Sequence, residues 1–496
     1  CLRVAADGSL AVTPHPAAWG SALTHPYLTT DYSEALVEFV TPPLDGVGPA
    51  IRFLQELHAF AARTNASELL WPASMPCIIG GDDSVPIAQY GSSNEGRLRT
   101  IYRSGLGFRY GRSMQAIAGL HFNFSLSPDL WGPYREFAGG DVDAAAFRSE
   151  RMMGLVRNYR RIGWLVTYLY GASPAFCRSF RREGHAGLEP LDADTWYAPY
   201  STSLRMSDMG YRNSTQARLS ISVNSLGEYL AELEAALTTR EPGYEAIGVI
   251  RDGEYRQLNA NVLQLENEYY SSIRPKPATK SPRLIAALRR DGVEYVEVRT
   301  LDLNPFAPLG VTDEQSRFLE LLLLHCLLTE SAPISVAEQN EIDQRELAVA
   351  WEGRRPGLEL QRDGKPVALR EWALQVLDQL DRIAGTLGPD RDIYVAACAS
   401  ARASVLEPEQ TLSARVIGAL ESGQMSFLEW VLARAAKQRE HFLAFEFEPH
   451  RLAELESVAR ESQAEAEALE NADEPPFGEF LARFLATGIG PAPERA

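Results

Sequence analysis

The segment DGVEYVEVRTLD, residues 291–302, combines strand-forming residues with side chains that could do chemistry. Its β-branched residues and its Asp-Gly turn signal predict a strand. Because side chains alternate between the two faces of a strand, Glu297, Arg299 and Leu301 are expected on one face. A carboxylate beside a guanidinium is either a surface salt bridge, which contributes little stability, or part of a charged site.

A second group of carboxylates lies in TTDYSEALVEFVTPP, residues 29–43. Thr30 or Asp31 could cap a short helical turn that carries Glu34, whereas Glu38 is flanked by apolar residues and needs a partner. The alternative is structural: an N-cap, a glutamate that interacts with the helix dipole, and a glutamate at the rim of the core.

The segment GLHFNFSL, residues 119–126, alternates polar and apolar side chains as a strand does. His121, Asn123 and Ser125 would share one face. That face suits the wall of a cleft, where an imidazole can bind a metal or a phosphate oxygen. The alternative is a histidine whose hydrogen bonds serve only the fold.

Two loop-like segments, residues 203–216 and 268–277, carry cationic side chains and tyrosines where anionic substrates could meet them. Solvated charge is the alternative for both segments. The residues concerned are Arg205, Tyr211, Tyr270, Arg274 and Lys276.

Composition limits the partners of this chain. Asp and Glu number 66 against 48 Lys and Arg, the formal net charge is -18, and no basic stripe is present. Nucleic acid and anionic membranes are therefore not expected as partners. The sequence lacks a P-loop and a G-x-G-x-x-G fingerprint, so phosphate chemistry would have to use metals and arginines. An acidic chain that handles ATP needs divalent cations between its carboxylates and the phosphates.

The cysteines and the longest apolar run bear on location. The five cysteines are odd in number, far apart and without a C-x-x-C pair, which favours a reducing compartment. The run FLELLLLHCLL, residues 318–328, is too short to span a bilayer and predicts a buried helix. These features predict a cytoplasmic protein.

Two regions differ in their pattern. Residues 1–310 mix short β-like runs, turns and helices, whereas residues 311–496 show apolar spacing near 3.6, typical of helices. The connection NPFAPLG, residues 304–310, is tight, so we expect one integrated α+β unit with a mainly sheet-bearing part and a mainly helical part. The acidic helix predicted within residues 456–480 has charges on most faces and is expected to be solvated.

Several long blocks of unusual composition follow one another along nearly the whole chain. They include GSALTHPYLTTDYSEALVEFVTP, AQYGSSNEGRLRTIYRSGLGFRYG, MQAIAGLHFNFSL, TSLRMSDMGY, NVLQLENEYYSSIRPKP and GVEYVEVRTLDLNPF. In their order and content these blocks resemble the proteobacterial glutamate–cysteine ligase family. The helical tail, including TLSARV, is similar too, though less specific.

The resemblance implies synthesis of γ-glutamylcysteine, the first step towards glutathione. ATP would phosphorylate the γ-carboxylate of L-glutamate, the amine of L-cysteine would attack, and phosphate would leave. Both reacting groups of the first step are anionic, so the resemblance implies Mg²⁺ ions, or Mn²⁺ in their place, held by carboxylates. It also implies a monomer and feedback inhibition by glutathione.

The functional residues of the family fall on the segments described above. By similarity the metal ligands are Asp31, Glu38, His121 and Glu297. Arg299 would stabilise the charge of the transferring phosphoryl group. The residues implied around the cysteine substrate are Tyr102, Leu106, Gln115, Arg205, Tyr211 and Tyr270. Arg274 and Lys276 are expected to face the phosphates of ATP.

The implied fold is a curved antiparallel sheet that forms a funnel-like active site, with helices packed outside, as in glutamine synthetase. The sequence departs from the family at its start. Just upstream of the block that matches CLRV, family members carry a strand of the type Gly-apolar-Glu-basic-Glu, whose two glutamates also bind metal. That strand has no counterpart here, so we expect the sequence to be a truncated record and expect this exact chain to be weakened in phosphoryl transfer.

Two alternatives remain at this stage. One is a γ-glutamyl ligase for another small amine, which a substrate panel would reveal. The other is a non-catalytic relative that binds glutamate or nucleotide without turnover. Both the ligase and the non-catalytic relative would bind ATP, but only an enzyme would release ADP when glutamate and cysteine are both present.

Overall fold

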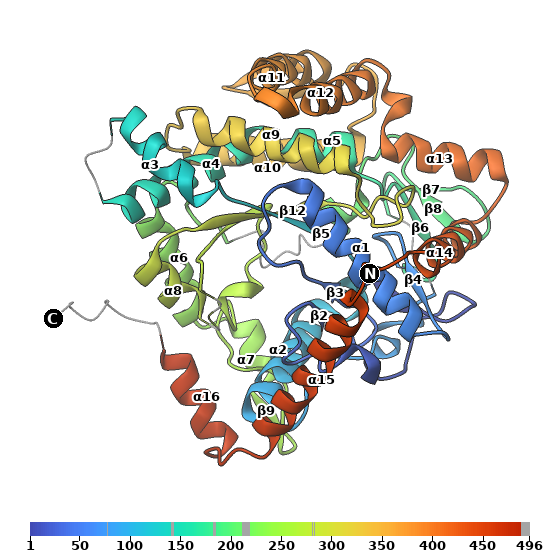
Figure 1. The fold of residues 1–496 in the computed structure, drawn as a ribbon, viewed down its shortest axis with the longest axis vertical. Coiled ribbons are helices and arrows are strands. Elements are labelled where there is room, and N and C mark those ends of the chain that lie inside the picture. Colours follow the sequence, from blue (N-terminus) through green and yellow to red (C-terminus); the bar gives the residue numbers. More distant parts are fainter. Residues whose placement is uncertain are drawn as a thin grey trace.

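Three antiparallel strands form the sheet that carries the 291–302 segment. They are β5 (Leu120–Phe124), β11 (Ile273–Lys276) and β12 (Tyr295–Leu301), with β12 in the middle. The sheet lies near the centre of the computed structural model in Figure 1. The structure describes residues 1–76, 78–139, 143–181, 185–210, 219–279, 281 and 283–487. The strands predicted within 119–126 and 291–302 are confirmed. The loop-like structure predicted for 268–277 was wrong at Ile273–Lys276, because this backbone pairs with β12.

The two faces of this sheet differ in polarity. Glu297 pairs with Arg274 on one side and with Asn123 on the other. Because alternate residues share a face, the polar face carries His121, Asn123, Arg274, Lys276, Tyr295, Glu297 and Arg299. The opposite face carries buried apolar side chains: Phe124, Ile273, Val296 and Val298.

A β-bulge interrupts the alternation predicted for β12. The pairing of β12 with β5 shifts between Val298 and Leu301. Leu301, expected beside Glu297 and Arg299, is buried in the same apolar cluster as Val298. A bulge adds a residue to one strand and re-aims the side chains beyond it, so the prediction for Leu301 was wrong.

Helices cover the apolar face of the sheet (Figure 1). α4 (Ala144–Ile162) packs against β11, and α9 (Asp313–Leu328) packs against α4 and β5. α9 begins with a capping box in which the Thr312 hydroxyl accepts a hydrogen bond from the backbone N–H of Gln315. It buries most of its leucines, which confirms the buried helix predicted at 318–328. Among the described residues, no helix is both long and apolar enough to span a membrane.

The segment 29–43 forms a β-hairpin where the sequence predicted a capped helical turn. β2 (Leu28–Thr30) and β3 (Val37–Phe39) pair antiparallel, with Thr29 opposite Glu38. The helical turn was a wrong prediction because cross-strand hydrogen bonds satisfy this backbone instead.

Glu34 sits in the loop of that hairpin and serves the fold. Its two carboxylate oxygens accept hydrogen bonds from the backbone N–H groups of His15, over 2.7 Å, and Gln89, over 2.8 Å. The side chain is buried. Glu34 therefore fixes two distant segments to the hairpin and is not available to the site.

The remaining strands pair in twos and threes, which confirms the α+β class. β1 (Leu2–Val4) pairs with β4 (Leu69–Trp71), β9 (Ile250–Arg251) with β10 (Glu254–Tyr255), and β13 (Glu359–Arg362) with β14 (Lys365–Ala368). A second three-stranded sheet contains β6 (Ala175–Cys177), β7 (Glu189–Pro190) and β8 (Thr195–Tyr197).

The other helices fall into two groups along the chain. The first group is α1 (Val47–Thr64), α2 (Asn94–Tyr110), α3 (Pro128–Phe137), α5 (Trp164–Tyr170), α6 (Leu226–Thr238), α7 (Pro242–Ile247) and α8 (Leu284–Asp291). The second group is α10 (Val336–Glu352), α11 (Leu369–Ala384), α12 (Arg391–Leu406), α13 (Leu412–Gly423), α14 (Phe427–Leu443), α15 (Arg451–Glu470) and α16 (Phe477–Ala486).

The acidic segment 456–480 is less solvated than its charges predicted. α15 buries Leu455 and Ala459 in a cluster with residues of α1. α16 buries Phe477 and Leu481 in another cluster. The many glutamates occupy the remaining faces, so a narrow apolar stripe was enough to dock both helices.

The cysteines are not all free. Cys177 is disulfide-bonded, whereas Cys1, Cys326 and Cys398 are free thiols. The odd number and wide spacing of the cysteines gave no signal for this bond, because cysteines that pair can be far apart in sequence.

Candidate active site

A large cleft opens on the polar face of the three-stranded sheet. Its volume of ≈ 2560 Å³ exceeds the roughly 300–1,000 Å³ of a typical pocket for one small ligand. Every described residue that the sequence assigned to the site lines this cleft: Asp31, Glu38, Tyr102, Leu106, Gln115, His121, Arg205, Tyr270, Arg274, Lys276, Glu297 and Arg299. Tyr211 lies outside the described residues. The cleft therefore has room for more than one substrate at once.

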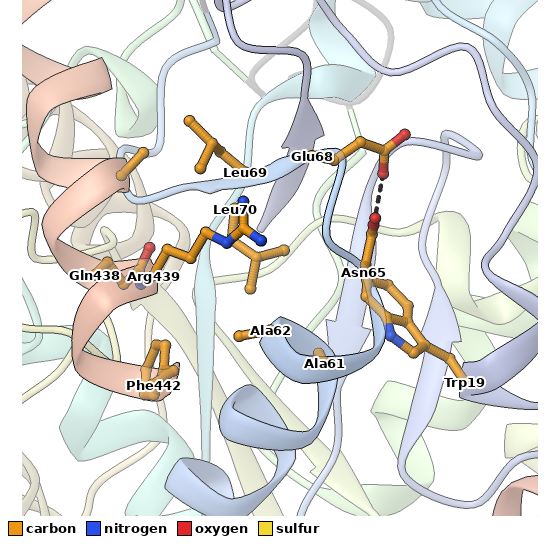
Figure 2. A pocket seen from close by; sticks show the side chains of 11 residues that line it. Trp19, Ala61, Ala62, Asn65, Glu68, Leu69, Leu70, Gln438, Arg439 and Phe442 are labelled. Atoms are coloured by element: carbon orange, nitrogen blue, oxygen red, sulfur yellow. Dashed lines mark hydrogen bonds between the residues drawn. The ribbon is translucent and has the colours of Figure 1, made fainter. Parts of the chain in front are cut away.

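A second, much smaller cavity lies between α1, β4 and α14, as Figure 2 shows. Its volume is ≈ 20 Å³, and its walls include Trp19, Leu70, Arg439 and Phe442. A space of this size holds about one water molecule. It is too small for a substrate, so the chemistry belongs to the large cleft.

The central charged contact of the cleft joins Glu297 to two cations on its own sheet. Nη1 of Arg299 donates to Oε1 of Glu297 over 2.7 Å, and Nζ of Lys276 lies 3.3 Å from Oε2. Burial alone would raise the pKa of Glu297, but the charges of Lys276 and Arg299 hold it well below its ordinary value. Glu297 is therefore ionised throughout the physiological range.

Positive charge accumulates on the same face. Burial, followed by repulsion from Arg299, lowers the pKa of Arg274. Burial also lowers the pKa of Lys276, and its cationic neighbours add to the effect. Three cations around one carboxylate leave a net positive surface, which suits an anionic ligand such as a phosphate.

His121 stands on the same face, on the edge strand β5. Enclosure by the cleft walls and, next, the positive charge of Arg299 hold the pKa of His121 well below its ordinary value. The imidazole is therefore neutral near pH 7, and a neutral imidazole is the form that binds metals.

The β2–β3 hairpin brings Asp31 and Glu38 to the cleft. Burial raises the pKa of Glu38 to about 7, and the negative charges of Asp31 and Glu297 add to the rise. Arg103 of α2 holds the hairpin in place, since its guanidinium donates to the carbonyl oxygens of Asp31 and Thr30. The negative charge of Glu38 is therefore not fully compensated by the cations of the site, and a bound cation would stabilise it.

The carboxylates fit a metal ion only in part. Among the described residues, no three His, Cys, Asp or Glu side chains are grouped closely enough to hold an ion. Asp31 and Glu38 offer hard oxygen ligands that repel each other, and a divalent cation would relieve that repulsion. Both oxygens of Glu297 already contact Arg299 and Lys276, so Glu297 would have to leave at least one of them to bind a metal.

Arg205 lies in the cleft wall and is almost fully buried. Its Nη1 is 3.5 Å from a carboxylate oxygen of Asp302, and its Nη2 donates to the carbonyl of Arg299 over 2.8 Å. Asp302 also accepts hydrogen bonds from the hydroxyls of Ser173, over 2.6 Å, and Ser203, over 3.0 Å. This network fixes the end of β12, where Arg299 is attached.

The uncharged candidates come from three other segments. Tyr102 and Leu106 are one helical turn apart on α2, Gln115 belongs to the 3₁₀ helix Ser113–Ala116, and Tyr270 precedes β11. Burial raises the pKa of Tyr102, so its hydroxyl stays neutral. Together they give this side of the cleft a neutral, partly aromatic lining.

Sequence reasoning missed three residues that shape the site. Asp302 was noticed only as a charge in the predicted strand, and Arg103 and Glu268 were not considered. Glu268 is fully buried in a salt bridge with Arg109, over 2.9 Å, which ties α2 to the segment before Tyr270. Each of the three residues has a partner more than 70 residues away in sequence, and no local pattern could reveal these contacts.

Comparison with protein families and curated proteins gives a consistent result. Residues 1–349 match the family described as "Glutamate-cysteine ligase". The glutamate–cysteine ligase of Pseudomonas paraeruginosa is 45% identical over 493 residues, covering 99% of this chain and 93% of that protein. The glutamate–cysteine ligase of Alcanivorax borkumensis is 46% identical over 496 residues, covering 98% and 94%.

Solved structures agree. The crystal structure of glutamate–cysteine ligase from Francisella tularensis in complex with AMP superposes with a TM-score of 0.92 at 34% identity, covering 98% of this chain and 95% of that one. A bifunctional glutathione synthetase from Pasteurella multocida superposes with a TM-score of 0.71 at 23% identity, covering 92% of this chain and 55% of that one, and shows the fold alone.

Proposed function

This chain belongs to the glutamate–cysteine ligase family, and we propose on that basis how its cleft performs the reaction. The protein is an ATP-dependent ligase that joins the γ-carboxylate of L-glutamate to the amine of L-cysteine. The products are γ-glutamylcysteine, ADP and phosphate. A volume of ≈ 2560 Å³ is large enough for the three substrates together.

The chemistry requires activation of a carboxylate. A γ-carboxylate is a poor electrophile, so ATP transfers its γ-phosphoryl group to it and the acyl phosphate forms. The amine of cysteine then attacks the acyl carbon, the new C–N bond forms, the C–O bond to phosphate breaks, and the amine loses a proton. The protein has to hold two anions together in the first step.

One observation carries the assignment of roles: the polar face of the sheet presents Glu297 among Arg274, Lys276 and Arg299, beside the carboxylates of the hairpin. We propose that Arg299 contacts the transferring phosphoryl group and stabilises its charge in the transition state. Arg274 and Lys276 would bind the phosphates of ATP. A guanidinium fork suits this role better than a point charge.

We also propose that the cleft binds Mg²⁺, or Mn²⁺ in its place. Asp31 and Glu38 would hold it, with His121 and Glu297 as further ligands once Glu297 leaves its cationic partners. Such an ion would neutralise charge on the phosphates and on the γ-carboxylate. The like-charge repulsion at Glu38 supports this placement.

The cysteine substrate is proposed to bind against α2 and the segment before β11. Tyr102, Leu106, Gln115 and Tyr270 would enclose its side chain, and Tyr211 stays a predicted member of this subsite. Arg205 stays the predicted partner of the cysteine carboxylate. The ion pair of Arg205 with Asp302 and its hydrogen bond to the Arg299 carbonyl support a second role for Arg205, which is to hold β12 in position.

The wider expectations also remain proposals. We propose that the small sheets around the cleft act as the funnel of a glutamine synthetase-like fold, and that residues 1–496 work as one unit. Apolar clusters that combine residues from before and after residue 310 support that unity. A cytoplasmic monomer, inhibited by glutathione, completes the proposal, since glutathione contains both the γ-glutamyl and the cysteinyl groups of the product.

The test is ADP release with Mg²⁺, ATP, glutamate and cysteine, each omitted in turn. The proposal expects ADP only when all are present, with γ-glutamylcysteine formed in equal amount. Faster turnover with another amine would identify a different γ-glutamyl ligase. ATP binding without ADP release, both in this chain and in one extended upstream, would reject the enzymatic assignment.

A further inference from the structure

The last two described helices contact both sides of the proposed cysteine subsite. Residues 470–486 lie outside the part of the chain that matches the family, residues 1–349. Figure 1 shows α15 and α16 (red) beside α2 (blue). Phe480 and Phe484 of α16 line the cleft. This segment is therefore a wall of the site.

Two glutamates of this segment bind the N-terminus of α2. Oε1 of Glu470 accepts hydrogen bonds from the backbone N–H groups of Ser92, over 2.6 Å, and Ser93, over 3.1 Å. Oε2 of Glu474 accepts from the N–H of Asn94 over 2.7 Å. Asn94 is the first residue of α2, and its N–H has no partner within the helix, whereas Ser92 and Ser93 lie directly before it; negative charge at this end of a helix is favourable. Both carboxylates thus fix the end of the helix that carries Tyr102.

The other end of α16 is bound to the opposite side of the subsite. Nη1 of Arg283 donates to the carbonyls of Phe484, over 2.7 Å, and Leu485, over 3.0 Å. Nε of the same guanidinium donates to Glu266 over 3.1 Å, in a salt bridge whose side chains are 3% and 2% exposed. Glu266 begins the segment that leads to Tyr270.

Apolar packing joins the two ends. Phe477 and Leu481 of α16 are buried against Leu98 of α2, and Tyr102 packs at the edge of the same cluster. The guanidinium of Arg97 lies over the Phe477 ring at 4.3 Å. α16 therefore connects α2 to the 266–270 segment as one packed body.

We propose that α16 and the turn before it form a brace that sets the distance between Tyr102 and Tyr270, with Glu470, Glu474 and Arg283 as positioning residues. The inference rests on the proposed function, because it assigns this gap to cysteine. Loosening the brace would weaken cysteine binding more than ATP binding or turnover. The brace acts through the two walls and contacts no reacting atom.

The test variant is the double substitution Glu470→Ala with Glu474→Ala, which removes two exposed carboxylates and spares the core. We expect KM for cysteine to rise about fivefold, a factor in keeping with the loss of two carboxylates at a helix N-terminus, while kcat and KM for ATP change little. Glu470→Gln with Glu474→Gln keeps oxygen acceptors and should recover most of the affinity. Glu465→Ala, an exposed glutamate on α15, is the matched control.

Hydrogen–deuterium exchange tests the brace independently of the reaction. In the alanine double variant, amides of residues 264–270 should exchange faster along with those of 92–98, although no substituted side chain touches the first segment. Faster exchange confined to 92–98, with KM for cysteine unchanged, would overturn the brace. If the wild type forms no γ-glutamylcysteine but both segments still loosen together, the brace stands and the cysteine assignment falls.

Discussion

Arg299 and Glu297 lie two residues apart on the polar face of β12, and the guanidinium of Arg299 donates to the Glu297 carboxylate over 2.7 Å. Both side chains line the cleft. A guanidinium already neutralised by one carboxylate can exchange that partner for a phosphate when ATP is present. Under the proposed function, this exchange would place Arg299 at the reacting group and free Glu297 for a cation.

Replacing Arg299 with lysine tests this role. A lysine keeps the positive charge but cannot reproduce the planar fork. We expect Arg299→Lys to bind ATP and glutamate almost normally and to lose turnover by about 10²–10³-fold, the usual effect of removing one transition-state donor. Steady-state kcat and equilibrium titration of ATP measure the two properties. Arg290→Lys, at an exposed salt bridge with Asp291, is the control, and a wild-type kcat in Arg299→Lys would refute the assignment.

Lys276 is expected to contribute to the binding of ATP and not to the binding of cysteine. Its ammonium lies 3.3 Å from Glu297 on the face that would meet the phosphates. Lys276→Ala should raise KM for ATP by about tenfold, the loss of one charge-assisted contact worth roughly 1.4 kcal/mol, and leave KM for cysteine unchanged. Initial rates with each substrate varied in turn give the two KM values. Lys365→Ala, on the exposed β13–β14 hairpin, should change neither constant.

Metal affinity should rise with pH. The pKa of Glu38 is raised to about 7 by burial and by its acidic neighbours, so below that pH the carboxyl carries a proton that a cation must displace. Mn²⁺ titrations followed by electron paramagnetic resonance at pH 6 and pH 8 should show tighter binding at pH 8. In Glu38→Gln this pH dependence should disappear. Equal affinity at both pH values in the wild type would contradict the placement of the ion at Glu38.

Breaking the ion pair of Asp302 and Arg205 should destabilise the folded protein. The two side chains are 0% and 2% exposed, and removing one partner of a buried ion pair costs about 3–5 kcal/mol. Asp302→Asn should lower the free energy of unfolding by that amount, measured by urea denaturation followed by fluorescence. Asp313→Asn, in an exposed salt bridge with Arg317, should change stability by less than about 1 kcal/mol. Equal effects in both variants would show that the network at Asp302 is dispensable.

The sequence by itself determined two strands of the central sheet, β5 and β12, and their faces. The third strand, β11, lies in the segment 268–277 that was predicted to be loop-like. Strict alternation around His121 and Glu297 fixed which side chains point the same way, because a strand has a period of two residues. Leucine spacing likewise fixed the buried helix at 318–328. Long blocks of similarity then identified the family, which the comparisons confirmed.

Only the tertiary structure decided which distant residues meet. The hairpin at Glu38 replaced a predicted helical turn because β2 pairs with β3 and because the backbone N–H groups of Val37 and Glu34 donate to the distant carbonyls of Cys1 and Pro86. Asp302, Arg103 and Glu470 acquired their roles from contacts with residues far away in sequence. Secondary structure follows from local periodicity, whereas ion pairs, the bulge after Val298 and the brace depend on how the chain folds back on itself, which no local pattern encodes.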